Sequence, residues 1–430
     1  MTRKRRVVVT GLGLATPLGL DVEGNWGKLL GGLSGIGPVS LPGSDASPIR
    51  AVGEVNVADL RRIRDRFPDD SLEQGERRTL FALWAAASAL RDAGLSNTYG
   101  NRQRFGIAAA AGVGTHRLED LSRWTAQQRN FDVSRFMREF GHAHPASILK
   151  NSADRPASLI SRRFRLYGAN LTLTSACASA TLALGMGYRR VASGEADLMV
   201  AGGADSMLNP IGLVFFLLLT AASTSRDRPE TICRPFDRKR SGLVIGEGAG
   251  FAVLEDLSHA LERGARIYAE VAGCGTSLDA HSVTAPEPRG RGIEAAMVTT
   301  LNDAGLKGGD IDHINAHATG TRLNDVAETI AIKRVFKNHA ARIPISASKS
   351  MIGHLMAAAG GPEFIYTVMS VARDEVHPTI NLENPDPACD LDYVPEGKRH
   401  CRVRAALSNS SGFGGQNAVI AVKKYHELNR

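Results

Sequence analysis

Cysteine is scarce in this 430-residue sequence, and the five cysteines form no recognisable pattern. Their number is odd, their spacing is irregular, and no two of them make a Cys-x-x-Cys pair. This argues against a disulfide framework and against a zinc knuckle, because both need cysteines at regular spacings. Unpaired cysteines are typical of a reducing compartment, so the sequence predicts a cytoplasmic protein without a metal site.

Long hydrophobic runs are also lacking. The longest apolar run, from Ile211 to Ala222, is far shorter than the ~20 residues that cross a bilayer. The basic N-terminus, Met1 to Arg6, is followed by an apolar stretch that is too short for a signal peptide. We therefore expect neither secretion nor membrane insertion.

Aromatic residues make up only 6% of the sequence, while the net charge is +8. An excess of positive charge favours an acidic partner, either a nucleic acid or an acidic protein. No nucleic-acid motif occurs and aromatic side chains for stacking are few, so we expect no nucleic-acid partner. Arginines cluster at several places, including Arg77 and Arg78, although a single basic cluster is more often a solvated helix face.

A third glycine is missing from the first glycine-rich turn. Val7–Val9 predict a buried strand, but a dinucleotide-binding loop would need a glycine where Thr16 stands. Pro17 would also break the helix that should receive the pyrophosphate. We therefore expect no cofactor at this turn or elsewhere.

What the sequence does contain is an alternation of apolar strands and helices, in two stretches that meet near residue 265. Such alternation predicts parallel sheets with helices on their faces, a layered α/β architecture. We expect two closely packed halves, residues 1–265 and 266–430, because no low-complexity linker separates them. Residues 116–150 are polar and mixed, which predicts an inserted surface region.

The stretch from Thr172 to Ala180 places a cysteine where a strand pattern changes to a helix pattern. Leu173 ends the alternating apolar run, small residues follow, and a helical pattern begins directly after Cys177. Unpaired N–H groups and the dipole at a helix N-terminus lower the pKa of a thiol and favour the nucleophilic thiolate. A lone cysteine is about as often a buried structural residue, so this stretch alone leaves both interpretations open.

Two downstream segments carry histidines in small-residue turns. His317 follows the expected strand at residues 311–316, while Lys349 and His354 precede an alanine-rich helix. Small residues let a backbone approach a ligand, so both segments suit the wall of a pocket. A single histidine is about as often a partly buried structural residue. The combination of these three residues with Cys177 is far less expected by chance and predicts a catalytic site.

Several motifs along the chain share an order that is specific to one family. They are Val7-Val-Val-Thr-Gly-Leu-Gly13, Ser175-Ala-Cys-Ala-Ser179, Asn315-Ala-His317, Lys349-Ser-Met-Ile-Gly-His354, Pro378-Thr-Ile-Asn-Leu-Glu-Asn-Pro-Asp386 and Ser408-Asn-Ser-Ser-Gly-Phe-Gly-Gly415. With them the chain resembles a β-ketoacyl-acyl carrier protein synthase of the synthase II type, a condensing enzyme of the thiolase superfamily. The resemblance runs from about Arg6 to Lys423 and implies a thiolase-like layered fold, α/β/α/β/α, built from two similar halves.

The resemblance implies a decarboxylative Claisen condensation, in which Cys177 accepts an acyl chain from an acyl carrier protein. His317 and His354 would hold the thioester carbonyl of a malonyl donor on the same kind of carrier and stabilise the enolate formed as CO2 leaves. Lys349 would order the site and tune its charge. The N–H groups of Cys177 and Phe413 would form an oxyanion hole, because the flanking glycines let the Phe413 amide bend toward the helix terminus. The residues implied in supporting roles are Asp325, Glu328, Glu363, Thr319 and Thr321.

The resemblance also assigns residues to substrate binding. Val113 and Phe216 would line an acyl tunnel, and Arg77 and Arg78 would lie near the pocket entrance and dock an acidic carrier protein. The family is dimeric, which leaves a homodimer or a heterodimer with a ketosynthase-like subunit. Asn324, next to Asp325, is more like ketosynthases of aromatic or polyene polyketide systems, so the pathway stays open between fatty-acid and polyketide synthesis.

Alternatives to a fatty-acid condensing enzyme remain at this point. One is a ketosynthase subunit of a type II polyketide system that works with a chain-length-factor-like partner. A second is a non-catalytic subunit that shapes product length, but such a subunit lacks the nucleophile that Cys177 supplies. A third is a papain-like hydrolase, which would need one histidine with an Asn or Asp to orient it, while this chain offers two separate histidines and a lysine.

Overall fold

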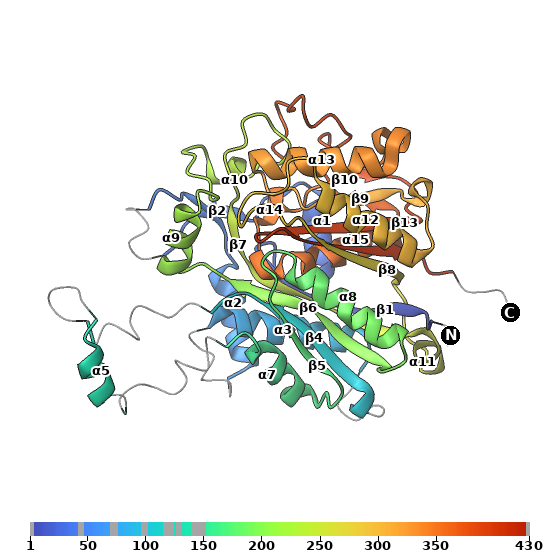
Figure 1. Cartoon of the computed structure of the whole chain (residues 1–430). Coiled ribbons are helices and arrows are strands. Elements are labelled where there is room, and N and C mark those ends of the chain that lie inside the picture. Colours follow the sequence, from blue (N-terminus) through green and yellow to red (C-terminus); the bar gives the residue numbers. More distant parts are fainter. Residues whose placement is uncertain are drawn as a thin grey trace.

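The computed structural model describes residues 4–41, 47–68, 76–95, 102–114, 124–125, 131–139, 141 and 152–426. Its main feature is an extended sheet that consists of two half-sheets (Figure 1). In the first half the strands lie in the order β5 (Asn170–Leu173), β4 (Phe105–Ala111), β6 (Leu198–Ser206), β7 (Ile245–Asp256) and β1 (Val7–Ala15). In the second half the order is β10 (Ile345–Ser346), β9 (His313–Asn315), β13 (Ala405–Gly412), β14 (Gln416–Lys423) and β8 (Ala269–Leu278).

The two half-sheets match strand by strand in direction. In each half the three strands farthest from the junction are parallel, and each of the next two reverses direction. At the junction Val7–Val9 of β1 pair antiparallel with Ala269–Val271 of β8. This repetition is the arrangement of two similar halves that the thiolase-like resemblance implies.

The expected parallel pairing holds for only three strands of each half-sheet, and the turn between β13 and β14 shows why. Only residues 413–415 separate these strands, and Gly412 pairs directly with Gln416. A parallel pair would need a crossover of a dozen or more residues, so a connection this short makes the pair antiparallel. The alternation of strands and helices indicates the layered class, but it does not give the direction of each strand.

Helices form three layers around the two half-sheets. Helices α8 (Ser179–Ala192) and α15 (Gly360–Arg373) contact strands of both halves and make the central layer (Figure 1). Helices α3 (Arg77–Asp92) and α7 (Arg155–Phe164) cover the outer face of the first half, and α12 (Arg291–Ala304) and α13 (Arg322–Phe336) pack on the second. The layers therefore follow the order α/β/α/β/α.

The glycines of β1 explain the first glycine-rich motif. A Cβ atom on Gly13 would lie 2.0 Å from the Ala85 carbonyl oxygen, and one on Gly11 would lie 2.1 Å from that of Ala89. Both oxygens belong to α3, so the motif lets this helix pack directly on the strand. The glycines thus serve helix packing.

The remaining elements are shorter and connect the layers. They are α1 (Val22–Leu30), β2 (Ile36–Pro38), β3 (Ala51–Gly53), α2 (Val57–Arg66), α5 (Val133–Glu139), α9 (Pro210–Leu218), α10 (Pro229–Ile232), α11 (Leu257–Glu262), α14 (Lys349–Ile352), β11 (Glu375–Val376), β12 (Arg399–His400) and short 3-10 turns, including Met356–Ala358. The predicted insertion at residues 116–150 lies mostly outside the described residues. Within the described ranges, no helix has the length and apolarity to cross a bilayer.

Candidate active site

Cys177 lies in a tight turn between β5 and α8. The preceding residue, Ala176, has a left-handed φ of 46°, which is uncommon for a residue other than glycine. The Ser179 hydroxyl accepts the Ser175 N–H at 2.7 Å and closes the turn. The Cys177 side chain is 7% exposed, and helix α8 begins two residues later.

The environment of the Cys177 thiol differs from the one that the sequence predicts. Burial raises the pKa of the thiol to about 12, although the Lys349 charge and the Phe413 N–H act in the opposite direction. The expectation that the helix terminus lowers this pKa is therefore wrong for the unliganded chain, because removal from water outweighs the nearby positive charge. The resting residue is a thiol.

His317 lies just beyond the end of β9 in a turn that Glu328 holds. The two carboxylate oxygens of Glu328 accept the N–H groups of His317 and Ala318, each at 2.9 Å. Ala318 has a left-handed φ of 38°, so a second strained residue adjoins a candidate catalytic side chain. Asn409 donates to Glu328 at 3.1 Å and steadies the carboxylate.

His354 is fixed both through its backbone and through its ring. Its N–H donates to the Val244 carbonyl at 2.7 Å, and its carbonyl accepts the Gly246 N–H at 2.8 Å. The ring atom Nδ1 accepts the Met356 N–H at 3.1 Å. In the neutral ring the proton is therefore on Nε2, which is buried and has no hydrogen-bond partner among the described residues.

The imidazole rings of His317 and His354 lie close together in an edge-to-face arrangement. Their centroids are 5.3 Å apart, and the ring planes are nearly perpendicular, at 83°. Burial and the Lys349 charge hold the pKa of both His317 and His354 well below the usual range, so both rings are neutral. Lys349 Nζ lies 3.3 Å from His317 Nδ1 and donates to it, which leaves the His317 proton on Nε2 as well.

Lys349 is paired with Glu363 in the interior. Each residue is 1% exposed, and the ammonium group donates to Glu363 Oε1. Burial raises the pKa of Glu363 to about 7, against the effect of the Lys349 charge. The pair places a positive charge beside His317 without protonating either histidine.

The predicted supporting residues divide into two groups. Glu363 and Glu328 contact the candidate catalytic residues directly, as described above. Asp325 instead accepts the Phe236 N–H at 3.0 Å and lies 3.6 Å from Arg240 Nε, so it holds a neighbouring loop. Thr319 and Thr321 join through their hydroxyls at 2.9 Å and line the cavity.

A cavity of about 450 Å³ brings the candidate residues together. Its lining includes Cys177, His317, His354, Thr319, Thr321 and Phe413. The Phe413 N–H donates a hydrogen bond to the Cys177 sulfur. A Cβ atom on the neighbouring Gly412 would be 3.1 Å from the Cys177 nitrogen. Glycine at position 412 therefore lets the β13–β14 turn approach the cysteine.

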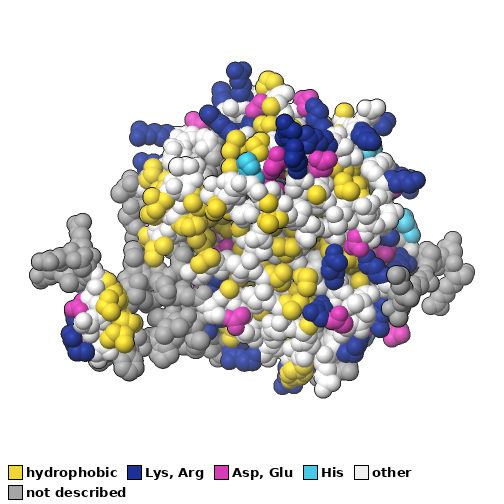
Figure 2. Space-filling view, viewed as in Figure 1, with side chains coloured by type: hydrophobic (Ala, Val, Ile, Leu, Met, Phe, Trp, Pro, Cys, Tyr) yellow, Lys and Arg dark blue, Asp and Glu magenta, His cyan; other side chains and the backbone are white. Residues whose placement is uncertain are grey.

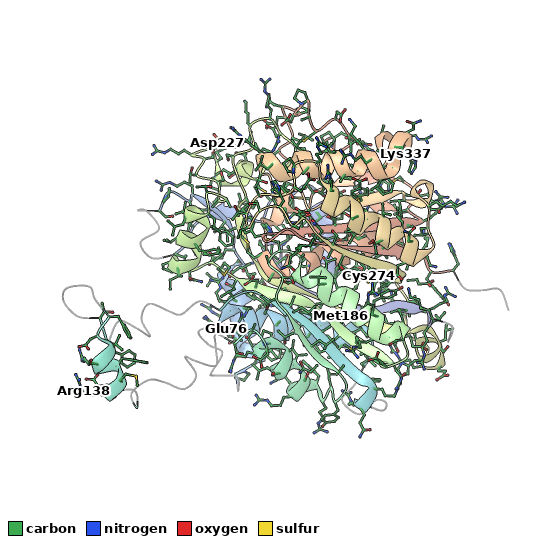
Figure 3. The ribbon with its side chains drawn as sticks, viewed as in Figure 1. Glu76, Arg138, Met186, Asp227, Cys274 and Lys337 are labelled. Atoms are coloured by element: carbon green, nitrogen blue, oxygen red, sulfur yellow. The ribbon has the colours of Figure 1, made fainter. Side chains whose placement is uncertain are left out.

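The structure corrects the predicted docking role of Arg77 and Arg78. Arg78 is 3% exposed and donates to Glu76, labelled in Figure 3, and to the Gly112 carbonyl at 2.8 Å. Arg77 pairs with Glu54 at 2.9 Å and with the buried Glu247. Both guanidinium groups are engaged inside the chain, so they do not form an exposed basic surface.

The two predicted tunnel residues lie outside the lining of the described cavity. Phe216 is buried on α9 in a cluster that includes Met356 and, at its edge, Phe413. Val113 follows β4 and is 70% exposed in the single chain, so its tunnel role stays a prediction. Apolar side chains also gather on the face over α9, where Phe215 and Leu218 are exposed (Figure 2).

The sequence did not indicate several residues that shape the site. Ala176 and Met356 have left-handed φ values of 46° and 49°, and neither is a glycine that would have marked a turn. Asn409 belongs to the motif at Ser408–Gly415, which could have directed attention to it. Asp205, at the end of β6, carried no sequence signal and is taken up below.

Comparisons with known proteins agree with this geometry. Residues 4–260 match the family model "Beta-ketoacyl synthase, N-terminal domain", and residues 268–383 match "Beta-ketoacyl synthase, C-terminal domain". The chain is 41% identical over 423 residues to 3-oxoacyl-[acyl-carrier-protein] synthase 2 of Synechocystis sp., covering 98% of this chain and 99% of the relative. It is 39% identical over 427 residues to a putative polyketide beta-ketoacyl synthase 1 of Streptomyces halstedii, covering 97% of each.

Solved structures extend the likeness to the fold. A ketosynthase of a type II polyketide synthase, in complex with its acyl-carrier protein, superposes with a TM-score of 0.87 at 31% identity and covers 98% of this chain and 100% of its own. The ishigamide ketosynthase/chain length factor gives a TM-score of 0.86 at 33% identity, with the same coverage.

The fold has five layers built from two similar halves, and its cavity brings a cysteine at a strand-to-helix turn together with two neutral histidines. This combination defines the class of thiolase-like condensing enzymes. Within that class the chain belongs to the β-ketoacyl synthase family, as a synthase II-like acyltransferase.

Proposed function

We propose that this enzyme joins an acyl chain on Cys177 to a malonyl donor by decarboxylative Claisen condensation. The Cys177 sulfur attacks the acyl thioester, the carrier thiolate leaves, and the thiol proton passes to that thiolate. The malonyl group then loses CO2, and its enolate carbon attacks the acyl carbonyl. The bond to Cys177 breaks, and the released thiolate takes up a proton, which its pKa of about 12 favours.

The observation that carries the proposal is the state of the two histidines. Both rings are neutral, both keep the proton on Nε2, and both line the cavity that holds Cys177. Two N–H donors in a water-poor site suit an oxygen atom that gains negative charge, such as the enolate oxygen left by decarboxylation. A base that removes a proton would need a different arrangement.

The acyl-transfer step develops charge on a second oxygen. The N–H groups of Cys177 and Phe413 are suited to it, because Gly412 brings the Phe413 turn against the nitrogen of Cys177. In our proposal burial, together with the Lys349 charge, keeps both histidines neutral, Glu363 fixes Lys349, and Glu328 holds the turn that carries His317. Thr319 and Thr321 would contact the arm of the incoming thioester.

We further propose acyl carrier proteins as partners in both steps. Two comparisons support this proposal. The Synechocystis relative is named 3-oxoacyl-[acyl-carrier-protein] synthase 2, and one of the similar solved structures is a ketosynthase in complex with its acyl-carrier protein. We also propose a dimer and a division of the chain into residues 1–265 and 266–430. The strand repeat, which restarts at β8, supports that division.

A second candidate is a ketosynthase subunit of a type II polyketide system. The Streptomyces relative is 39% identical to this chain, close to the 41% of the Synechocystis relative, and the two solved ketosynthases are 31% and 33% identical. In that case a chain-length-factor-like subunit replaces the second copy. Co-expression with such a subunit and analysis of the complex by size-exclusion chromatography distinguish the two assemblies.

Chain length depends, in this proposal, on Val113 and Phe216. One methylene of pocket space changes discrimination by only ~1–3 kcal/mol, so Val113 alone would shift the preference without setting it. Val113→Phe should block long acyl chains and spare acetyl and butyryl groups, measured as acylation of Cys177 across a chain-length series. Equal loss of short and long chains would remove Val113 from the tunnel.

Intact-mass measurement of the acyl-enzyme tests the function. Wild-type protein mixed with an acyl-loaded carrier protein should gain one acyl group. Cys177→Ala should gain none and should lose condensation, while its decarboxylation of the malonyl donor survives. Cys233→Ala is the matched control, because Cys233 is also buried and its pKa is also raised to about 12. Acyl mass that persists in Cys177→Ala would refute the assignment.

A further inference from the structure

A buried carboxylate, Asp205, holds the turn that follows His354. Asp205 lies near the end of β6 and is 2% exposed. Its Oδ2 accepts the Ala357 N–H at 3.0 Å, and its Oδ1 accepts the Ser206 N–H at 2.8 Å. The family motifs discussed above do not include this residue, and it does not line the cavity.

The Ala357 N–H is one of two successive donors that fix the conformation of Met356. The Met356 N–H donates to His354 Nδ1 at 3.1 Å, and the next N–H, of Ala357, donates to Asp205. These two amides belong to the peptide planes on either side of the Met356 Cα, so together they fix its φ and ψ. Met356 has a φ of 49°, and a residue other than glycine adopts this backbone conformation only where its surroundings hold it there.

The space around Asp205 is also specific. A Cβ atom on Gly112 would lie 2.3 Å from Asp205 Oδ2, so only a glycine leaves room for the carboxylate there. Burial raises the pKa of Asp205 to about 6, and the Arg78 charge and the two bonded N–H groups oppose that rise. Above that pH the carboxylate is ionised and accepts both N–H groups.

We propose that Asp205 is a positioning residue for His354. By holding the Ala357 N–H it keeps Met356 in the left-handed conformation, which directs the Met356 N–H onto His354 Nδ1 and leaves the Nε2 proton facing the cavity. The role rests on the proposed function, since it matters only if His354 donates to the reacting oxygen. Asp205 does not line the cavity, and its charge is only one of the smaller causes that raise the Cys177 pKa, so acylation should depend on it far less than decarboxylation does.

Asp205→Asn is the first test, because it keeps the side-chain volume but leaves one oxygen for two N–H groups. We expect decarboxylation of malonyl carrier protein to fall roughly 10- to 100-fold, the cost of misplacing a reacting group, while acylation of Cys177 stays nearly unchanged. In a His354→Ala background Asp205→Asn should cause no further loss. A Met356→Gly background should recover much of the lost rate, because glycine adopts positive φ without strain.

Asp237→Asn is the matched control. Asp237 is fully buried, and its carboxylate accepts the N–H groups of Glu383 at 2.9 Å, Asn384 at 2.6 Å and Lys239 at 2.7 Å, none of which belongs to the turn that follows His354. It should lower the melting temperature without a selective loss of decarboxylation. If Asp205→Asn does not yield folded protein, Gly112→Ala displaces the same carboxylate from the other side and should give the same selective loss.

The outcomes separate the inference from the function. The positioning role would be overturned if the rate losses of Asp205→Asn and His354→Ala multiplied in the double variant, or if Asp205→Asn behaved like the control. The proposed function would stand in either case. Wild-type enzyme that neither acylates Cys177 nor releases CO2 from malonyl carrier protein would overturn both.

Discussion

Two pairs of buried histidines lie in the second half of the chain, and only one of them lines the cavity. His317 and His354 have ring centroids 5.3 Å apart at 83°, and His313 and His377 have centroids 6.5 Å apart at 80°. Burial lowers the pKa of all four, to about 3 for His313 and about 4 for His377. A lowered pKa is therefore no guide to which pair performs chemistry.

The pairs differ in what their nitrogen atoms contact. In the first pair Lys349 and the Met356 N–H occupy both Nδ1 atoms, so the protons are on the Nε2 atoms and the rings adjoin the cavity. In the second pair His377 Nδ1 donates to the Pro378 carbonyl, and Ser346 bridges His313 Nε2 to the His377 carbonyl. The second pair thus stabilises the interior behind the site. A histidine's role is set by the contacts of its two nitrogens and by access.

Removal of one ring from each pair should give the largest contrast. His317→Ala or His354→Ala should slow decarboxylation ~10²–10³-fold, the effect of losing one donor to a developing oxyanion. His313→Gln and His377→Gln should change that rate by no more than roughly threefold, since their rings do not line the cavity. Steady-state CO2 release measures both.

The contrast includes its own control, because all four side chains are almost completely buried. Melting temperatures recorded for every variant separate a loss of fold from a loss of chemistry. A His313→Gln variant that folds normally and loses decarboxylation as severely as His317→Ala would break the distinction between the pairs.

Acid should destabilise the fold through both pairs, and the second pair isolates this effect because it does not line the cavity. The folded-state pKa values of His313 and His377 are below 6.5, so the unfolded chain binds protons first as the pH falls. The stability that these two histidines contribute is therefore full well above pH 6.5 and is lost as the pH falls toward 4 for His377 and toward 3 for His313. At pH 5 each histidine should account for about 2 kcal/mol of lost unfolding free energy.

His377→Gln tests this, because glutamine does not titrate and its amide can still donate to the Pro378 carbonyl. Urea unfolding from pH 7.5 to 5 should show a smaller acid loss in the variant than in wild type. Other groups, such as Asp205, titrate in both proteins and cancel in the difference. Parallel curves for the two proteins would show that His377 is protonated as easily in the fold as outside it.

The sequence predicted the chemistry of the site better than its mechanical support. Cys177, His317 and His354 were found because each sits among small residues at the end of a strand or the start of a helix pattern. Of the residues that hold them, Glu328 and Glu363 were predicted, whereas Ala176, Met356 and Asp205 were not. Ala176 and Met356 adopt left-handed conformations that tertiary contacts impose, and no residue preference signals such a conformation in alanine or methionine.

Charge and strand direction failed for a related reason. Arg77 and Arg78 formed a basic cluster in the sequence, but Arg77 pairs with Glu247, which lies far along the chain, and Arg78 is buried against Glu76 and the Gly112 carbonyl. Likewise the layered fold followed from local patterns. The antiparallel direction of β7 and β14 depends instead on which strands pair in the folded sheet. Local pattern gives element type, and long-range pairing decides exposure and direction.

The smallest effect that distinguishes the two histidine pairs comes from the charge of Lys349. For His317 and His354 burial is the first cause of the lowered pKa and Lys349 the second, whereas Lys349 has no part in the pKa of His313 or His377. Lys349→Met should therefore raise the pKa of the first pair and leave the second unchanged. In the wild type all four rings stay largely neutral between pH 5 and 8, so NMR of histidine-labelled protein over this range shows which rings become protonated in the variant.

Lys333→Met is the control for the removal of one positive charge, because Lys333 is an exposed residue paired with Asp390. It should shift none of the four histidines, since exposed charges are screened by solvent. If Lys349→Met moved both pairs equally, the effect would be a general loosening of the interior. If it moved neither, Lys349 would hold His317 by hydrogen bonding alone, and its charge would have no part in keeping the first pair neutral.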